Sequence, residues 1–183
     1  MAITKVADFA IKNFSPKAKF VLDTNILYFV HSGYYMPTNP KSIIYSNLLQ
    51  QLLGNNCEIL ISALNVQELL YGIENKEYEL YLNSTGLTRQ ACTKKDYRKI
   101  TTERIKLSCK MRTVLTELSA SYKCIDGEIK YEQIEQFVRK LQAHHYDPID
   151  YAVVDNLHTI GQVVFISDDT DFQYDTSIQL ITA

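Results

Sequence analysis

The sequence predicts an α/β protein in which a central, mainly parallel sheet lies between two layers of helices. Short continuous apolar runs occur along the chain, as is typical of parallel strands that are buried on both faces. Segments whose apolar residues have helical spacing separate these runs. This alternation of strands and helices predicts a three-layer α/β/α sandwich.

Four runs are expected to form the strands, at residues 19–22, 57–62, 162–167 and 177–181. The helices are expected over 26–32, about 43–52, from Asn65 onwards, through most of 75–142 and over 147–161. The second strand is followed by two candidate helix caps, Ser62 and Asn65, and Gly72 is a candidate interruption. Asp147 is the expected cap of the helix whose first turn contains Pro148.

The length of 183 residues predicts one domain, 1–183, with a sizeable core. Residues 1–18 form an N-terminal extension, either a short packed helix or a loose arm, and residues 76–145 form a helical, basic insertion. The four cysteines have no paired short spacing, which indicates reduced thiols and a cytoplasmic protein. No run reaches the roughly 18 apolar residues of a membrane-spanning helix, so we expect no membrane association.

Charge is distributed unevenly along the chain, although the net charge is only −2. Ten of the 19 basic residues lie between Arg89 and Lys123, opposed by three acids, whereas residues 147–175 contain seven acids and no Lys or Arg. This segregation predicts a polyanion bound at one place and a cation at another. The alternative is that the two charged regions are solvated faces that neutralise each other.

Acidic residues occur at the ends of several predicted elements. Asp23 ends the first strand, Glu68 lies early in the helix after the second strand, and Asp150 lies in the first turn of its helix. Three further acids follow the strand that ends at Ser167, namely Asp168, Asp169 and Asp171. Because strand carboxyl ends and helix amino ends share one edge of a parallel sheet, we expect these groups to face one cleft.

Each acid has a structural alternative. Asp23 can cap its helix, with Thr24 and Asn25 as rival caps, and Glu68 is three residues after Asn65, as in a capping box. Asp150 meets a helix dipole, an interaction of about 0.3–1 kcal/mol. A gathering of four carboxylates is harder to explain in this way, because two charges about 4 Å apart repel by roughly 4 kcal/mol at an effective dielectric constant of about 20.

A divalent cation would relieve this repulsion. Carboxylate oxygens are the ligands of hard cations, so Mg²⁺ or Mn²⁺ is the expected cofactor. No Cys/His set has the spacing of a zinc site, and the adjacent pair His144 and His145 is weak evidence for ligation.

Four segments carry a resemblance to a known family. "VLDTNIL", "ISALNVQELLYG", "DPIDYAVVDNL" and "FISDDTDF" occur in the order and on the elements of the four motifs of PIN-domain nucleases. The chain resembles this family over roughly residues 19–75 and 146–183, and in particular its toxin-type members from bacterial toxin–antitoxin pairs. The matching acids are Asp23, Glu68, Asp150 and Asp169, with Asp171 and Phe172 completing the last motif.

The resemblance implies a PIN-like sandwich and a metal-dependent endoribonuclease. It also implies a homodimer and, for toxin-type members, an antitoxin protein as partner. Three features depart from the family pattern. Serine replaces the usual threonine at 167, Asp168 makes the fourth ligand ambiguous between Asp168, Asp169 and Asp171 with Asp169 favoured, and 82 positions separate Glu68 from Asp150.

The expected reaction is hydrolysis of an RNA phosphodiester bond by metal-activated water. The four acids Asp23, Glu68, Asp150 and Asp169 are the catalytic and metal-binding candidates, with Asp171 as a further ligand. Thr24, Asn25, Ser167 and Asp168 are supporting candidates. RNA-backbone contacts are expected from Lys94, Lys95, Arg98, Lys99, Arg104 and Lys106. Tyr34, Tyr35 and Tyr97 are candidates for base stacking, or else packing residues.

Three other classes of protein were considered. A haloacid dehalogenase phosphatase also begins with a strand-end aspartate, but it needs a second acid where this chain has Asn25. A phosphoacceptor receiver domain would not need Glu68. The remaining alternative is a non-cleaving PIN-like module that binds RNA or protein through residues 89–123.

Overall fold

The fold is built around β2, Lys19–Leu22, which lies in the middle of the sheet of this computed structural model. The structure describes residues 3–15, 17–35, 38–126, 129–140, 147–157, 159–174 and 177–183. Within these residues the other strands are β1 (Ile3–Lys5), β3 (Glu58–Ser62), β4 (Lys123–Ile125), β5 (Val163–Ile166) and β6 (Gln179–Thr182). The sheet is all parallel in the order β1-β6-β5-β2-β3-β4.

The order of the strands creates a switch point beside β2. The chain passes from β2 to β3 and β4 on one side, and then crosses back to β5 and β6 on the other. In register, Leu22 of β2 pairs with Ile61 of β3 and with Ile166 of β5, so the three strands end together. A crevice is expected at the carboxyl ends of β2 and β5, where the direction of the connections reverses.

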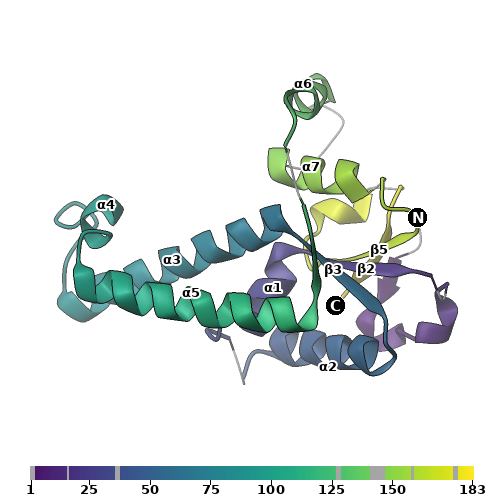
Figure 1. Ribbon diagram of the computed structural model, residues 1–183, viewed down its shortest axis with the longest axis horizontal. Helices are drawn as coiled ribbons and strands as arrows, with labels where there is room; N and C mark the ends of the chain where they lie inside the picture. Colours follow the sequence, from purple (N-terminus) through teal and green to yellow (C-terminus); the bar gives the residue numbers. More distant parts are fainter. Residues whose placement is uncertain are drawn as a thin grey trace.

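The helices lie on both faces of this sheet. They are α1 (Thr24–His31), α2 (Pro40–Gly54), α3 (Ala63–Thr85), α4 (Lys94–Tyr97), α5 (Thr101–Ser121), α6 (Tyr131–Lys140) and α7 (Pro148–Leu157). Side chains alternate along β2: Phe20 and Leu22 pack with α1, α2, α3 and α5, whereas Val21 packs with α6 and α7. The predicted three-layer sandwich is therefore present (Figure 1).

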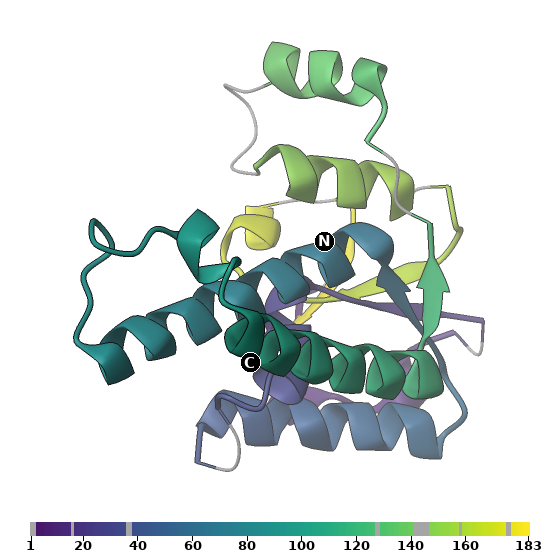
Figure 2. The same ribbon diagram turned by 60° about the vertical axis from the view of Figure 1, so that its left-hand side comes forward.

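The segment predicted as a helical insertion forms an arm. α3 and α5 lie side by side (Figures 1 and 2), and the short α4 packs against the middle of α3, where Lys94 contacts Tyr71 and Asn75. α3 is continuous through Gly72, so the predicted interruption is wrong. The segment also contributes the edge strand β4, which the sequence analysis did not identify, and α6, which packs on α7.

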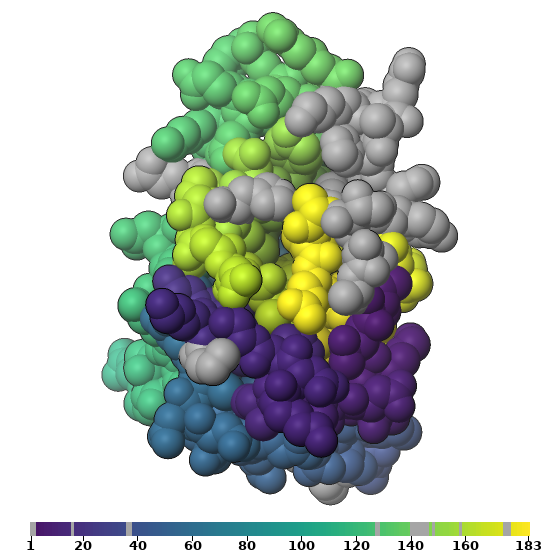
Figure 3. Space-filling view, turned by 90° about the vertical axis from the view of Figure 1, so that its right-hand side faces the viewer, coloured from purple at the N-terminus to yellow at the C-terminus, as the bar shows by residue number. Residues whose placement is uncertain are grey.

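The N-terminal extension is part of the sheet. Residues 3–5 form β1, which pairs with β6, and two short 3-10 helices follow at Val6–Asp8 and Ile11–Asn13. Because residues 3–5 form a strand, the interpretation of residues 1–18 as a packed helix or a loose arm is wrong for these three residues. Figure 3 shows the N-terminal and C-terminal residues side by side on one face. None of the helices described is long and apolar enough to cross a membrane.

Buried acids on α3 bind cations of the arm and, through Tyr34, the segment after α1. Glu77 is 6% exposed, and its Oε1 accepts hydrogen bonds from Tyr34 Oη at 2.8 Å and Lys110 Nζ at 2.9 Å. Burial raises the pKa of Glu77, but the bonds from Lys110 and Tyr34 outweigh this effect and hold it below its ordinary value. One turn earlier, Glu74 accepts two bonds of 2.6 Å from Arg98.

We expect Lys110→Ala to lower the free energy of unfolding by about 1–3 kcal/mol, because it removes a charged donor from the buried Glu77. Urea denaturation measures the change. Lys99→Ala is the matched control, since Lys99 pairs only with Asp96 at the surface and should change stability by less than about 0.5 kcal/mol. Equal effects of the two substitutions would show that the pairing of Glu77 does not stabilise the arm.

Candidate functional site

Asp23 is the most firmly held acid of the predicted site. It follows β2, is 5% exposed and caps α1, with its Oδ1 accepting a bond of 2.6 Å from Thr24 N. Its Oδ2 accepts bonds from Ser167 Oγ at 2.5 Å and Asn25 Nδ2 at 2.7 Å. Asp23 therefore caps α1, which was one of the alternatives in the sequence analysis. The same carboxylate also joins β2, α1 and the end of β5.

Glu68 lies on the second turn of α3 and is half-buried. Its Oε2 accepts a hydrogen bond of 2.6 Å from Thr24 Oγ1, which in turn accepts one of 3.0 Å from Asn65 Nδ2. The helix cap is Ser62, whose Oγ accepts from Leu64 N, so the predicted capping box of Asn65 and Glu68 is wrong. Glu68 is thus held by a hydroxyl from α1 and has no capping role.

Asp150 is presented by the first turn of α7. Asp147 caps this helix as predicted, because its Oδ1 accepts from Ile149 N at 2.7 Å and Asp150 N at 2.9 Å. The carboxyl group of Asp150 is therefore not used as the cap. It lies at the amino end of the helix, where the dipole favours negative charge.

The acids after β5 separate into different environments. Asp169 lines a cavity with the other three motif acids, and its Oδ1 accepts from Asp171 N at 2.9 Å. Asp168 points to α2 instead, where it bonds to Lys41 Nζ and accepts from Tyr45 Oη at 2.9 Å. Asp171 does not line the cavity.

The four motif acids come together around one cavity of about 400 Å³. Its walls also contain residues that the sequence analysis did not single out as site residues, namely Tyr28, Tyr71, Gly72 and Asp147. Helical spacing could have found two of them, because Tyr28 is four residues after Thr24 and Tyr71 is three residues after Glu68. Thr24 and Asn25 complete the lining. The buried Ser167 is not part of it but donates a hydrogen bond to Asp23.

The acids influence one another electrostatically. Burial raises the pKa of Asp23 to about 7, although hydrogen bonds from Ser167 and Thr24 lower it. The charges of Glu68 and Asp169 raise it further. The buried carboxyl group therefore titrates near neutral pH, in a region that already carries negative charge.

Asp150 has the same kind of environment. Burial raises its pKa to about 8, and the nearby acids add to this effect. Those acids are, in order of influence, Asp23, Asp147, Glu68 and Asp169. Four elements thus bring mutually repelling carboxyl groups to the switch point of the sheet.

Most cations of the basic segment are paired. Arg98 and Lys94 bind Glu74, Lys99 binds Asp96, and Lys106 lies 3.6 Å from Glu103 and 3.9 Å from Glu77. In the part of the chain that the structure describes, three cations of this segment make no ion pair, namely Lys95, Arg104 and Arg112. Acids outside residues 89–123 therefore offset part of the charge excess of this segment, namely Glu74, Glu77 and Glu79 of α3 and Glu58 of β3.

The tyrosines named from the sequence are packed. Tyr97 is 1% exposed, and Tyr34 lies beneath the Lys110 ammonium, which is 3.7 Å from its ring centroid. Tyr35 packs edge-on against Tyr28, and its exposed fraction is 37%. His144 and His145 lie outside the described residues.

Comparisons with known proteins find similarity in structure. No family model matches the sequence, and no curated protein matches it. A chain in the crystal structure of VapBC2 from Rickettsia felis bound to a DNA fragment from their promoter is 18% identical, with 88% of this chain and 96% of that chain covered and a TM-score of 0.51. A chain in the crystal structure of DNA-bound VapBC from Salmonella typhimurium is 15% identical, with 89% and 96% covered and a TM-score of 0.49.

The VapBC2 similarity confirms the expected fold class. This chain shares the fold of the VapBC2 chain, an α/β/α arrangement with an all-parallel sheet and helices on both faces. The division into one domain with an insertion stays a prediction, as do the roles of the site residues.

We expect Asp150→Asn to stabilise the metal-free protein progressively as pH rises from about 4 to about 8. In this interval the unfolded wild-type carboxyl group ionises while the folded one keeps its proton, so the wild type loses stability that the variant retains. Each pH unit changes the difference by up to about 1.4 kcal/mol.

Thermal denaturation at pH 5 and pH 8, with a chelator present, measures this difference. Asp8→Asn is the control, because Asp8 is exposed and lies outside the cavity. A stability difference between Asp150→Asn and wild type that is the same at both pH values would contradict the electrostatic description of the site.

Proposed function

We propose that this protein is a metal-dependent endoribonuclease that hydrolyses RNA phosphodiester bonds at the carboxylate cavity. The observation that supports this function is the convergence of Asp23, Glu68, Asp150 and Asp169 from four different elements. Helix capping accounts for the position of Asp23 alone among these acids. A group of buried and half-buried, mutually repelling carboxyl groups is costly unless a ligand of positive charge compensates it.

The donor atoms fit a hard divalent cation. All four acids offer carboxylate oxygens, the ligands that Mg²⁺ and Mn²⁺ prefer. Among the described residues, no three His, Cys, Asp or Glu side chains already stand in a metal-ligating arrangement, so binding requires side-chain rotation. We infer that Asp23, Glu68, Asp150 and Asp169 hold Mg²⁺ or Mn²⁺, with Asp171 outside the ligand set.

The neighbouring polar groups orient two of these ligands. Ser167 and Asn25 both donate to Oδ2 of Asp23, and Thr24 Oγ1 donates to Glu68. These bonds restrict rotation and leave the remaining lone pairs of both carboxylates for the cavity. A bound divalent ion lowers the pKa of a coordinated water and offsets the charge that develops on the phosphate.

We propose that the RNA backbone follows the cations of residues 89–123 that make no ion pair in the described part of the chain. Lys95, Arg104 and Arg112 are available for phosphate contacts, which give salt-dependent affinity without sequence preference. The paired cations can contact phosphates only if they leave or share their carboxylate partners. These cations are Lys94, Arg98, Lys99 and Lys106. The contribution of the basic segment is therefore smaller than its sequence charge indicates.

The partners are proposed from the resemblance and from the structural similarity. The resemblance to toxin-type PIN-domain nucleases and the fold shared with the VapBC2 chain support an antitoxin protein as the partner of this chain. A homodimer is the oligomeric state we propose. Neither partner is needed to explain the cavity, whose described lining comes from one chain.

The fourth acid can be identified with two neighbouring substitutions. Asp169→Asn should reduce cleavage of single-stranded RNA more than a hundredfold, because it removes a cavity carboxylate. Asp168→Asn is the matched control and should retain at least about a tenth of the activity, since Asp168 faces Lys41 and Tyr45. A gel-based cleavage assay with Mn²⁺ measures both variants.

The opposite order of these effects would assign the site to Asp168. A wild-type protein that cleaves no RNA with Mg²⁺ or Mn²⁺ would favour the alternative of a non-cleaving module that binds RNA or protein through residues 89–123.

Metal binding has a readout that does not depend on activity. Millimolar Mn²⁺ should raise the melting temperature of the wild type, because an ion that binds only the folded state stabilises it by about 2.7 kcal/mol at a hundred times its dissociation constant. Asp150→Asn should reduce the shift. Calorimetry with and without Mn²⁺ tests this, and an unchanged wild-type melting temperature would refute the metal site.

A further inference from the structure

An exposed aromatic ring lies on the wall of the carboxylate cavity. Tyr71 is 58% exposed, so packing does not account for its position. It follows Glu68 by three residues on α3, and both side chains face the same side of the helix. The ring is thus a little less than one helical turn, roughly 4.5 Å along the axis, from a proposed metal ligand.

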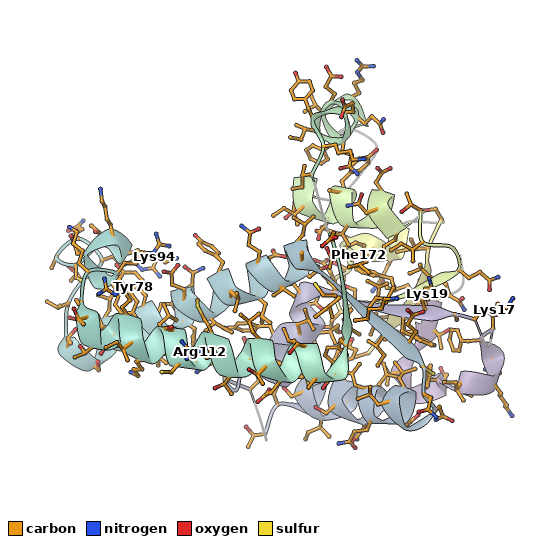
Figure 4. The ribbon with its side chains drawn as sticks, viewed as in Figure 1. Lys17, Lys19, Tyr78, Lys94, Arg112 and Phe172 are labelled. Atoms are coloured by element: carbon orange, nitrogen blue, oxygen red, sulfur yellow. The ribbon has the colours of Figure 1, made fainter. Side chains whose placement is uncertain are left out.

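A cation supports this ring. Lys94 Nζ lies 4.0 Å from the ring centroid of Tyr71, which is the geometry of a cation–π contact. The same ammonium bonds to Asn75 Oδ1 and lies 3.7 Å from Glu74 Oε2, so it is fixed from α3. Figure 4 shows Lys94 on the side of α4 that faces α3. One side of the ring is therefore occupied by a charge, and the residue still exposes most of its surface.

A second aromatic residue lines the same cavity because α3 has a glycine there. A Cβ at position 72 would lie 3.2 Å from Cε2 of Tyr28, so a larger residue would displace this ring. Tyr28 is half-buried and is held by ring contacts with Tyr34 and Tyr35. The cavity thus has both carboxylate and aromatic walls, and the Lys94 ammonium lies against one of the two rings.

We propose that Tyr71, supported by Lys94, is a stacking platform for the base of a nucleotide adjacent to the bond that is cleaved. The ligand class is single-stranded RNA, because only an unpaired base exposes the face that a tyrosine ring can cover. Lys94 adds positive charge at the rim of a negative cavity, where the neighbouring phosphate must lie. The position of the cleaved bond rests on the proposed function, whereas the stacking does not.

The test measures binding without cleavage. A short single-stranded RNA that contains 2-aminopurine is titrated with the full chain in the presence of a chelator, and anisotropy and 2-aminopurine quenching are recorded. Tyr71→Ala should weaken binding about ten- to a hundredfold and abolish the quenching. Tyr71→Phe keeps the ring and should behave as wild type. Lys94→Ala should weaken binding, and Lys94→Arg should restore it.

Tyr131→Ala is the matched control, because Tyr131 is 71% exposed on α6 and lies outside the cavity lining. Wild-type binding and quenching by Tyr71→Ala would overturn the platform, as would absence of quenching in the wild type. If Tyr71→Ala loses quenching in a protein that cleaves no RNA, the platform stands and the nuclease does not. If it binds normally in a protein that cleaves RNA, only the platform is refuted.

Discussion

The site depends on the hydrogen bonds that hold the Asp23 carboxylate at the switch point of the sheet. Three donors, from Thr24, Asn25 and Ser167, converge on this one buried side chain. They connect the end of β2, the start of α1 and the end of β5. Without these bonds, a carboxylate that is 5% exposed and adjacent to other acids would be strongly disfavoured in its charged form.

The arm formed by α3 and α5 shows why charge counted along a sequence differs from charge in space. The basic residues of 89–123 follow the acids Glu74 and Glu77 in the chain, and the packing of α5 and α4 on α3 brings the two sets together. A window that begins at residue 89 excludes those acids. The unbalanced charge that remains is small and belongs to Lys95, Arg104 and Arg112.

The central strands could be predicted because they are buried on both faces and therefore read as continuous apolar runs. The edge strands could not, since β1 and β4 have three residues each and are largely exposed. The convergence of Asp23, Glu68, Asp150 and Asp169 could be predicted from their positions at element ends. That Asp169 lines the cavity and Asp168 does not could be seen only in the structure, because it depends on α2, whose Lys41 and Tyr45 bind Asp168.

Tyr71, on the wall of the carboxylate cavity, connects the cavity to the basic segment. Lys94 belongs to the basic segment, yet it contacts Glu74, Asn75 and Tyr71 on the helix that also carries Glu68. A shift of α4 along α3 would therefore change the surroundings of Tyr71 and Glu74 before it changed any of the four cavity acids. One continuous helix, α3, carries both Glu68 of the carboxylate cavity and the residues that bind the basic segment. The four cavity acids come together although 82 positions separate Glu68 from Asp150.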